Sequence, residues 1–181
     1  MSIWPLVLAM SAQTTGTPPP PAPAAAAPAP PACTSAEFRQ FDFWIGEWEV
    51  SSGGKPAGRS RIQPIMDGCA ILENWRGASG TEGKSLNTWN TEASRWEQYW
   101  VSGGAPLHLV GGLVDGHMVL SGSHVPDPKT GKPRLERITW TPNADGSVRQ
   151  FWESSDDDGK TWAVSFDGVY RKVAIASPSH T

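Results

Sequence analysis

The chain has 181 residues, enough for one domain with a sizeable core, and its formal net charge is only −3. This balance gives no electrostatic reason to expect nucleic acid or an anionic membrane surface as a partner. The first 36 residues contain no Asp, Glu, Lys or Arg, so all of these charged side chains lie between Glu37 and Lys172. We therefore expect the folded part to start late in the chain.

The N-terminal segment Ile3 to Met10 is apolar but too short to span a bilayer, and the small residues Ser11 and Ala12 follow it. We interpret residues 1–12 as a secretory signal peptide that lacks the usual Lys or Arg; the alternative is a disordered N-terminus. The mature protein would then be periplasmic or secreted, without a transmembrane anchor.

Residues 13–32 are rich in Pro and Ala, a composition that favours extended polyproline II structure with no apolar face to bury. We interpret this segment as a linker, and the alternative is a Pro-rich ligand for an aromatic groove in a partner. Residues 33–173 are the expected folded domain, and residues 174–181 are an expected disordered tail.

Cys33 and Cys69 are the only cysteines in the sequence. In an oxidising compartment an even pair within one small domain is usually bridged, so we expect a disulfide between them; the alternative is two unpaired thiols. Because no Cys-x-x-Cys is present, the sequence does not indicate a redox or zinc role.

From Glu47 onward, short alternating or aromatic-rich segments are separated by turn residues, which is typical of a barrel or a sandwich. The ten tryptophans suit half-buried strand surfaces. We expect ten strands, at Glu47 to Ser52, Gly58 to Met66, Ala70 to Gly77, Lys84 to Asn90, Arg95 to Ser102, Leu107 to Leu113, His117 to Ser123, Leu135 to Thr141, Val148 to Ser154 and Trp162 to Lys172.

Short connections leave no room for crossover helices, so the sheet should be antiparallel and up-and-down. Asp115-Gly116 and Asp145-Gly146 predict hairpins, because a type I′ turn needs positive φ at both central residues. Only Ser35 to Phe43 looks helical, with Ser35 as a possible N-cap, and it would form a short plug that closes the barrel floor.

The run Phe41-Asp42-Phe43-Trp44-Ile45-Gly46-Glu47-Trp48 contains Gly-x-Trp at the start of the first strand. With the ten-strand layout, Asp67-Gly68-Cys69 and Glu73-x-Trp75-x-Gly77, it resembles a family of exported bacterial lipocalin-like proteins of unknown function. The resemblance implies an all-β, antiparallel lipocalin-like barrel and structural roles for Gly46 and Trp48. It also implies that Arg171 covers Trp48 at the closed end.

The run Ser155-x-Asp157-x-Gly159-x-Thr161-Trp162 matches the Asp-box of sialidases and related β-propellers. The chain has one copy and is too short for a propeller, so a sialidase activity is not indicated. We assign Asp157, Gly159 and Trp162 a structural role in a hairpin turn. The alternative is calcium binding by the run Asp156 to Asp158, which lacks a full set of spaced ligands.

A barrel of this size can hold a small ligand between aromatic walls and a few polar groups. Alternation places Ile71, Glu73 and Trp75 on one face of their strand, but the sequence does not say which face points inward. If the interior is a pocket, the candidate ligand-binding residues are polar Glu73, Asn87, Gln98, Arg137 and Arg149, with walls of Trp75, Trp89, Trp100 and Trp140. The alternatives are outer-face salt bridges for the polar residues and plain core packing for the tryptophans.

Three functions remain open. The favoured one is binding of a small, mainly apolar molecule, with no catalytic residue, metal or cofactor. The second is a structural or interaction module of the cell envelope with a filled interior. The third is an enzyme acting on an envelope metabolite or glycan, which an inward carboxylate with strongly perturbed titration in an open cleft would favour. Metal or haem binding by a pair among His108, His117 and His124 is a further alternative. The sequence indicates neither the ligand nor the oligomeric state.

Overall fold

The computed structural model describes residues 33–126 and 129–173. The expected signal peptide (1–12), linker (13–32) and tail (174–181) lie outside these described residues. Within the described part of the chain, no helix is long and apolar enough to cross a membrane.

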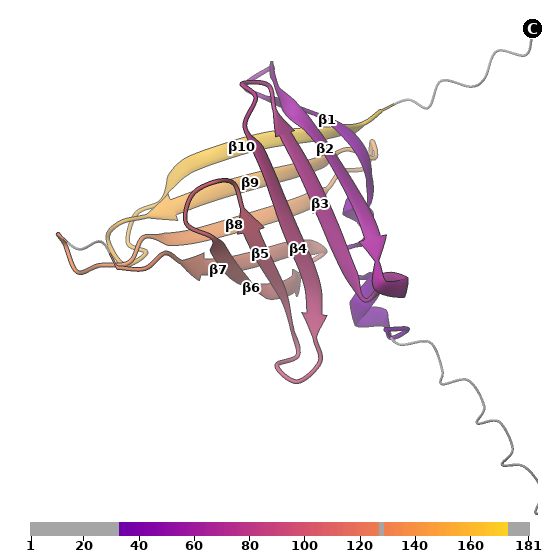
Figure 1. Ribbon diagram of the computed structural model, residues 1–181, viewed down its shortest axis with the longest axis horizontal. Helices are drawn as coiled ribbons and strands as arrows, with labels where there is room; N and C mark the ends of the chain where they lie inside the picture. The colour runs from indigo at the N-terminus through magenta and orange to yellow at the C-terminus, as the bar shows by residue number, and fades with distance from the viewer. Residues whose placement is uncertain (1–32, 127–128, 174–181) are drawn as a thin grey trace, which may run out of the picture. The chain divides into compact units, whose positions relative to one another are not determined.

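Ten antiparallel strands form one closed barrel, in which each strand pairs with its neighbours in the sequence and β1 also pairs with β10 (Figure 1). The strands are β1 (Gly46–Ser52), β2 (Lys55–Ile65), β3 (Ala70–Gly77), β4 (Glu82–Asn90), β5 (Arg95–Val101), β6 (Leu107–Val114), β7 (His117–Ser123), β8 (Leu135–Pro142), β9 (Val148–Ser155) and β10 (Ala163–Lys172). The ten-strand, all-β, antiparallel barrel expected from the sequence is thus confirmed. In Figure 1, β1–β4 run steeply while β8–β10 run nearly horizontally, so the two walls cross at a large angle.

The hairpin turns follow from residues that tolerate a left-handed backbone. Gly53 and Gly54, between β1 and β2, have φ values of 56° and 75°, and Asp115 and Gly116, between β6 and β7, have values of 50° and 82°. The turn at Asp145-Gly146 joins β8 to β9 but is built differently, because only Gly146 has a positive φ, at 78°. There the Asp145 carboxylate instead accepts a 3.0 Å hydrogen bond from the Ser147 backbone N–H.

The predicted N-terminal helix is instead two 3-10 segments, η1 (Ala36–Arg39) and η2 (Asp42–Trp44). Ser35 stands at the N-cap position of η1 without a capping side-chain hydrogen bond. Phe38 in η1 and Trp44 in η2 are both buried, so each of the two segments contributes an aromatic side chain to the interior. Phe41 and Trp44 are fully buried, and their ring centroids lie 5.0 Å apart.

These two aromatic residues form the centre of a core at one end of the barrel. The ring centroid of Trp140 on β8 lies 5.2 Å from that of Phe41 and 5.4 Å from that of Trp44. Trp96 on β5 meets Phe41 edge to face at 5.7 Å. Together these rings fill the closed end, as the plug prediction describes.

A disulfide between Cys33 and Cys69 fastens the N-terminal segment to the turn between β2 and β3. That turn contains η3 (Met66–Gly68), in which Asp67 has a φ of 54° and Gly68 a φ of 85°. The Arg39 guanidinium donates a hydrogen bond to the Gly68 carbonyl. The covalent link and the hydrogen bond therefore both tie the plug to the same turn.

Candidate functional site

The burial of alternate residues along each strand shows which side chains point into the barrel. On β3 these are Ile71, Glu73 and Trp75, since Ile71 and Glu73 are buried and Trp75 packs against the core. The opposite face of this strand carries residues such as Arg76, which is exposed. The alternation that the sequence left open thus turns Glu73 into the barrel.

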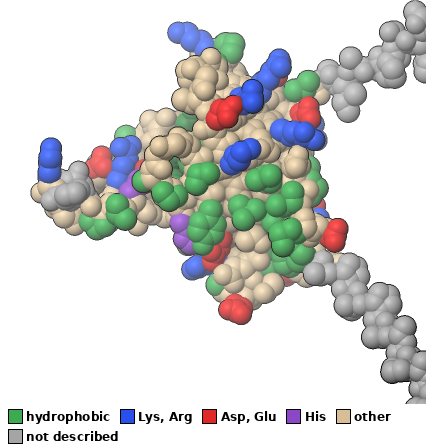
Figure 2. All heavy atoms as spheres, viewed as in Figure 1, with side chains coloured by type: hydrophobic (Ala, Val, Ile, Leu, Met, Phe, Trp, Pro, Cys, Tyr) green, Lys and Arg blue, Asp and Glu red, His purple; other side chains and the backbone are tan. Residues whose placement is uncertain are grey.

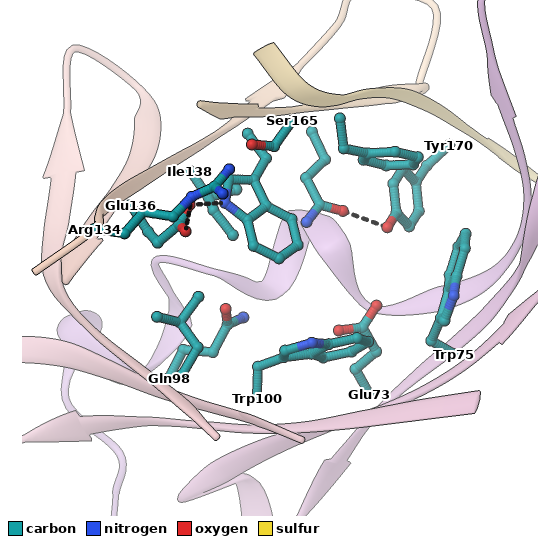
Figure 3. Close-up of a pocket in the computed structure, with 13 residues that line it drawn as sticks. Glu73, Trp75, Gln98, Trp100, Arg134, Glu136, Ile138, Ser165 and Tyr170 are labelled. Carbon is teal, nitrogen blue, oxygen red and sulfur yellow. Dashed lines mark hydrogen bonds and ion pairs between the residues drawn. The ribbon is translucent and has the colours of Figure 1, made fainter. Parts of the chain in front are cut away.

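Above the closed end the barrel holds a cavity of about 360 Å³. Its walls are mainly aromatic and aliphatic, and a few polar side chains interrupt them. The apolar lining consists of Trp75, Trp100, Leu107, Ile138, Trp152, Phe166 and Tyr170, and the polar lining of Glu73, Gln98, Arg134, Glu136, Gln150 and Ser165 (Figure 3). This size and this lining are those of a small-molecule site.

Two acids of the described barrel line the cavity, and Glu73 is the one without a basic partner. It is buried, at 4% exposure. Its two carboxylate oxygens accept hydrogen bonds of 2.9 Å from Ser60 on β2 and 2.9 Å from Ser85 on β4. Burial raises the pKa of Glu73 to about 7, and the two serine hydrogen bonds only partly oppose this rise. Glu73 therefore changes charge near neutral pH.

Behind Glu73, a chain of buried amides continues around the wall. Gln98 on β5 donates a 2.7 Å hydrogen bond to Asn87 on β4, and Asn87 donates a 3.0 Å bond to the Ser85 hydroxyl. Asn87 also reaches the Ile71 carbonyl at 3.2 Å. This network fixes the side chain that presents the carboxylate to the cavity.

Across the cavity, the hydroxyl of Tyr170 on β10 donates a hydrogen bond to Gln150 on β9 (Figure 3). Burial, and then the nearby Glu73 charge, raise the pKa of Tyr170 well above its ordinary value. Tyr170 therefore stays neutral throughout the physiological pH range.

The opposite part of the lining is more open and carries a compensated charge pair. Glu136 on β8 pairs with Arg134 at 3.2 Å, contacts His124 at 3.1 Å and accepts a 2.6 Å hydrogen bond from the Trp152 indole. The Arg134 side chain is 49% exposed, whereas the Glu136 side chain is 3% exposed. Arg134 therefore reaches solvent at the edge of the cavity, whereas Glu136 and Glu73 are both buried.

Several of the candidate ligand-binding residues do come together in this cavity, namely Glu73, Trp75, Gln98 and Trp100. Asn87 lies behind them, accepts a hydrogen bond from Gln98 and is linked to Glu73 through Ser85. Trp140 belongs to the closed-end core, and Trp89 is a partly buried side chain packed against that core. For these two tryptophans the structure favours the packing alternative.

Arg137 and Arg149 lie outside the cavity, contrary to the expectation for a polar interior. Arg137 pairs with Glu153 at 3.0 Å and stacks over Trp162 at 4.2 Å from the ring centroid. Arg149 pairs with Asp167 at 2.7 Å. In β8 and β9 the inward positions are the even-numbered ones, so odd-numbered residues such as these two face outward.

Sequence reasoning missed much of the wall that β8, β9 and β10 supply, above all Glu136, Gln150 and Tyr170. One indication in the sequence was the alternation of side chains along a strand. It places Glu136 on the same face as Ile138 and Trp140, and Gln150 on the same face as Trp152. No pattern in the sequence indicated that these strands lie across the barrel from Glu73.

At the closed end, Trp48 is buried, and its indole donates a 2.9 Å hydrogen bond to the Trp44 carbonyl. Gly46 has a φ of 153°, and a Cβ at this position would lie 3.3 Å from Nε1 of the same indole. The side chain over Trp48 is Lys172, whose Nζ lies 5.4 Å from the ring centroid. Arg171, predicted to take that place, is exposed and pairs in register with Glu49, because Lys172 is the residue opposite Trp48.

The Asp-box motif forms the turn between β9 and β10. Asp157 accepts hydrogen bonds from the Thr161 backbone N–H at 2.8 Å and from the Ser155 hydroxyl at 2.8 Å. These bonds, those from Thr161 first, lower the pKa of Asp157 to about 2. The Trp162 indole donates to the Gly159 carbonyl at 3.1 Å, so the hydrogen bonds of Asp157 and Trp162 lie within the turn.

The three candidate histidines are separated, each with a different partner. His108 contacts Glu97 at 3.0 Å, His117 contacts Thr141 at 3.0 Å, and His124 contacts Glu136 at 3.1 Å. Among residues 33–126 and 129–173, no group of three or more His, Cys, Asp or Glu side chains could hold a metal ion.

Comparison with protein-family models found no match for this chain, and comparison with curated proteins found none either. The assignment of a function therefore rests on the geometry of the barrel and its cavity.

The outer surface carries one apolar area relevant to the interaction hypothesis. Figure 2 shows hydrophobic side chains gathered near the middle of the viewed face, where Figure 1 places the steep strands. Leu86 on β4 and Tyr99 and Val101 on β5 are 40%, 46% and 48% exposed. That hypothesis also expected a filled interior, with which the cavity does not agree.

Proposed function

We propose that this chain is an exported protein of the lipocalin-like type that binds a small, mainly apolar molecule inside its barrel. The observation that carries the proposal is the cavity of about 360 Å³, with aromatic walls and a few fixed polar groups. Plain core packing would have filled this space, because protein interiors are close-packed.

Export is part of the proposal, and two features support it. The Cys33–Cys69 disulfide is typical of oxidising compartments. The apolar segment Ile3 to Met10 and the Pro/Ala-rich residues 13–32 have the composition of a leader followed by a spacer.

Native mass spectrometry of the protein, purified from its own compartment, tests ligand binding. We expect a discrete additional mass that disappears after mild organic extraction. A matched pair of variants locates the site: Ser165→Trp places an indole on the cavity lining, and Ser121→Trp places the same side chain at an exposed position on β7. Ser165→Trp should lose the bound mass and Ser121→Trp should keep it.

Two outcomes would contradict the proposal. One is an unliganded mass together with no binding of an apolar fluorescent dye such as Nile red. The other is equal ligand retention by both variants, which would place the ligand outside the cavity.

A second candidate function is general acid–base catalysis by Glu73, because its pKa of about 7 is close to the working pH of such a group. Incubating the extracted ligand with the ligand-free protein tests this candidate. Conversion of the ligand to a product, lost in Glu73→Gln while binding persists, would support an enzyme. Recovery of unchanged ligand would leave a binding protein.

A further inference from the structure

Glu73 differs from the other buried carboxylates of the described barrel in having no basic partner. Glu97 pairs with Arg95 at 3.0 Å and with His108 at 3.0 Å. Glu136 likewise has Arg134 and His124. Among the described residues, only uncharged Ser60 and Ser85 donate hydrogen bonds to Glu73, and no Lys, Arg or His forms an ion pair with it.

A buried, unpaired carboxylate is unfavourable when ionised unless an opposite charge approaches it. Each of its oxygens accepts one side-chain hydrogen bond, and a carboxylate oxygen can accept more than one, so Glu73 has acceptor capacity for a further partner. Figure 3 shows the Glu73 carboxyl between the rings of Trp100 and Trp75, on the cavity side of both. A ligand group that carries a positive charge would supply the missing partner.

The aromatic side chains around Glu73 favour the same kind of group. The ring centroid of Trp75 lies 6.2 Å from that of Phe166 and 6.4 Å from that of Tyr170, so three rings lie together at one side of the cavity. Trp100 adds a further ring, for which Gly83 leaves room, since a Cβ at that glycine would lie 2.2 Å from the Trp100 ring. Aromatic faces carry negative electrostatic potential and attract ammonium ions, quaternary ones included.

Arg134, the one basic side chain of the described cavity lining, does not disfavour a positively charged ligand group, because its own charge is balanced. Arg134 is held by Glu136 and donates a 2.6 Å hydrogen bond to Ser154. It lines the cavity next to Glu136, so their charges offset one another.

We propose that the cavity selects a small organic ammonium ion, with its nitrogen against the Glu73 carboxylate and its apolar body between the aromatic walls. This inference rests on the proposed binding function and specifies the class of ligand. It disfavours carboxylate ligands such as fatty acids, because their charge would repel that of Glu73 and because Arg134 is already paired with Glu136.

A proton and a cationic ligand should compete for Glu73, because a protonated Glu73 has no negative charge to attract the ligand. The groups that face Glu73 from the adjacent strands are the uncharged Ser60 and Ser85, and Tyr170 faces it across the cavity. Arg134 and Glu136 also line the cavity, and they pair with each other. A cation should therefore bind more tightly as the pH rises through about 7, the pKa of Glu73.

Three probes of similar shape test the inference: (2-phenylethyl)trimethylammonium, its uncharged carbon analogue (3,3-dimethylbutyl)benzene, and 4-phenylbutyrate. The quaternary cation does not titrate, so any pH dependence belongs to the protein. Binding is followed by the fluorescence of the cavity tryptophans. At pH 8 we expect the cation to bind about tenfold or more tightly than the uncharged analogue, and the carboxylate most weakly. Cation affinity should fall about tenfold or more between pH 8 and pH 5.5.

Glu73→Gln keeps the shape of the side chain and removes its charge. This variant should lose the preference for the cation and the pH dependence, while its affinity for the uncharged analogue changes less than about twofold. Glu153→Gln, which removes a carboxylate from the outward-facing pair with Arg137, is the matched control and should bind all three probes as wild type does.

The outcomes separate this inference from the proposed function. If the uncharged analogue binds as tightly as the cation, or if Glu73→Gln keeps the cation preference, the inference is wrong while the binding function stands. If no probe binds and no ligand co-purifies, both are wrong. The wild-type pH profile decides the matter even if Glu73→Gln fails to fold.

Discussion

Ser85 on β4 stands directly opposite Glu73 on β3 in the sheet register and donates a 2.9 Å hydrogen bond to its carboxylate. Because the donor is an uncharged hydroxyl, the hydrogen bond positions the Glu73 carboxylate without balancing its negative charge. An acid held in this way destabilises the folded state when it ionises, which leads to the first prediction.

We predict that the protein loses stability as the pH rises from about 4.5 to about 7. The pKa of Glu73 is raised from 4.5 to about 7 in the folded state, so the folded protein binds a proton that the unfolded chain releases. The full effect is roughly 3 kcal/mol of unfolding free energy, reached above pH 7. Urea denaturation at a series of pH values measures it.

The variant Glu73→Gln tests whether Glu73 causes this loss of stability. It should show little decrease in the free energy of unfolding with pH, and it should be more stable than wild type at pH 8. A decline of the same size in the variant would assign the effect to other groups.

The disulfide should contribute about 4 kcal/mol to stability, because it closes a loop with a sequence separation of 36 residues. The double variant Cys33→Ser, Cys69→Ser should show this loss in urea denaturation. Wild-type protein treated with a reductant should lose a similar amount, and the variant should not respond to the reductant. Equal stability of oxidised and reduced wild type would contradict the prediction.

Gly83→Ala should disturb the cavity wall through Trp100. A Cβ at position 83 would lie 2.2 Å from the Trp100 ring, so the ring must move, at a cost of about 1–3 kcal/mol. Near-ultraviolet circular dichroism should change, and probe affinity should fall. Gly112→Ala is the control, since a Cβ there meets no atom within 4 Å. Comparable effects of the two substitutions would mean that Gly83 matters only as a strand glycine.

Lys172 rather than Arg171 should stabilise the closed end. The Lys172 ammonium lies 5.4 Å from the Trp48 ring centroid, a contact that contributes about 0.5 kcal/mol at an exposed site. Lys172→Ala should therefore lower the free energy of unfolding more than Arg171→Ala does. The reverse order would restore the role that the lipocalin resemblance implied for Arg171.

The ten strands could be predicted because their determinants are local. Alternation along Gly46–Ser52 and turn pairs such as Gly53-Gly54 act within a few residues. The plug was predicted as a helix, but its aromatic residues pack against distant strands, and this tertiary packing favours two short 3-10 segments.

Part of the site could also be predicted. Glu73, Trp75, Gln98 and Trp100 were named as candidates because polar and aromatic residues alternate along their strands, and the structure brings them to one cavity. The error with Arg137 and Arg149 has a single cause, since a shift of one position moves a side chain from the interior to the surface.

By itself, the sequence determined the strand positions, most of the turns and the two cysteines available for pairing, because each depends on neighbouring residues or on composition. The tertiary structure alone decided which face of each strand points inward and which cation covers Trp48. It alone placed Glu136, Gln150 and Tyr170 across a cavity from Glu73. The physical reason is closure: pairing β1 with β10 sets one register for the whole barrel and brings together residues as distant as Trp48 and Lys172.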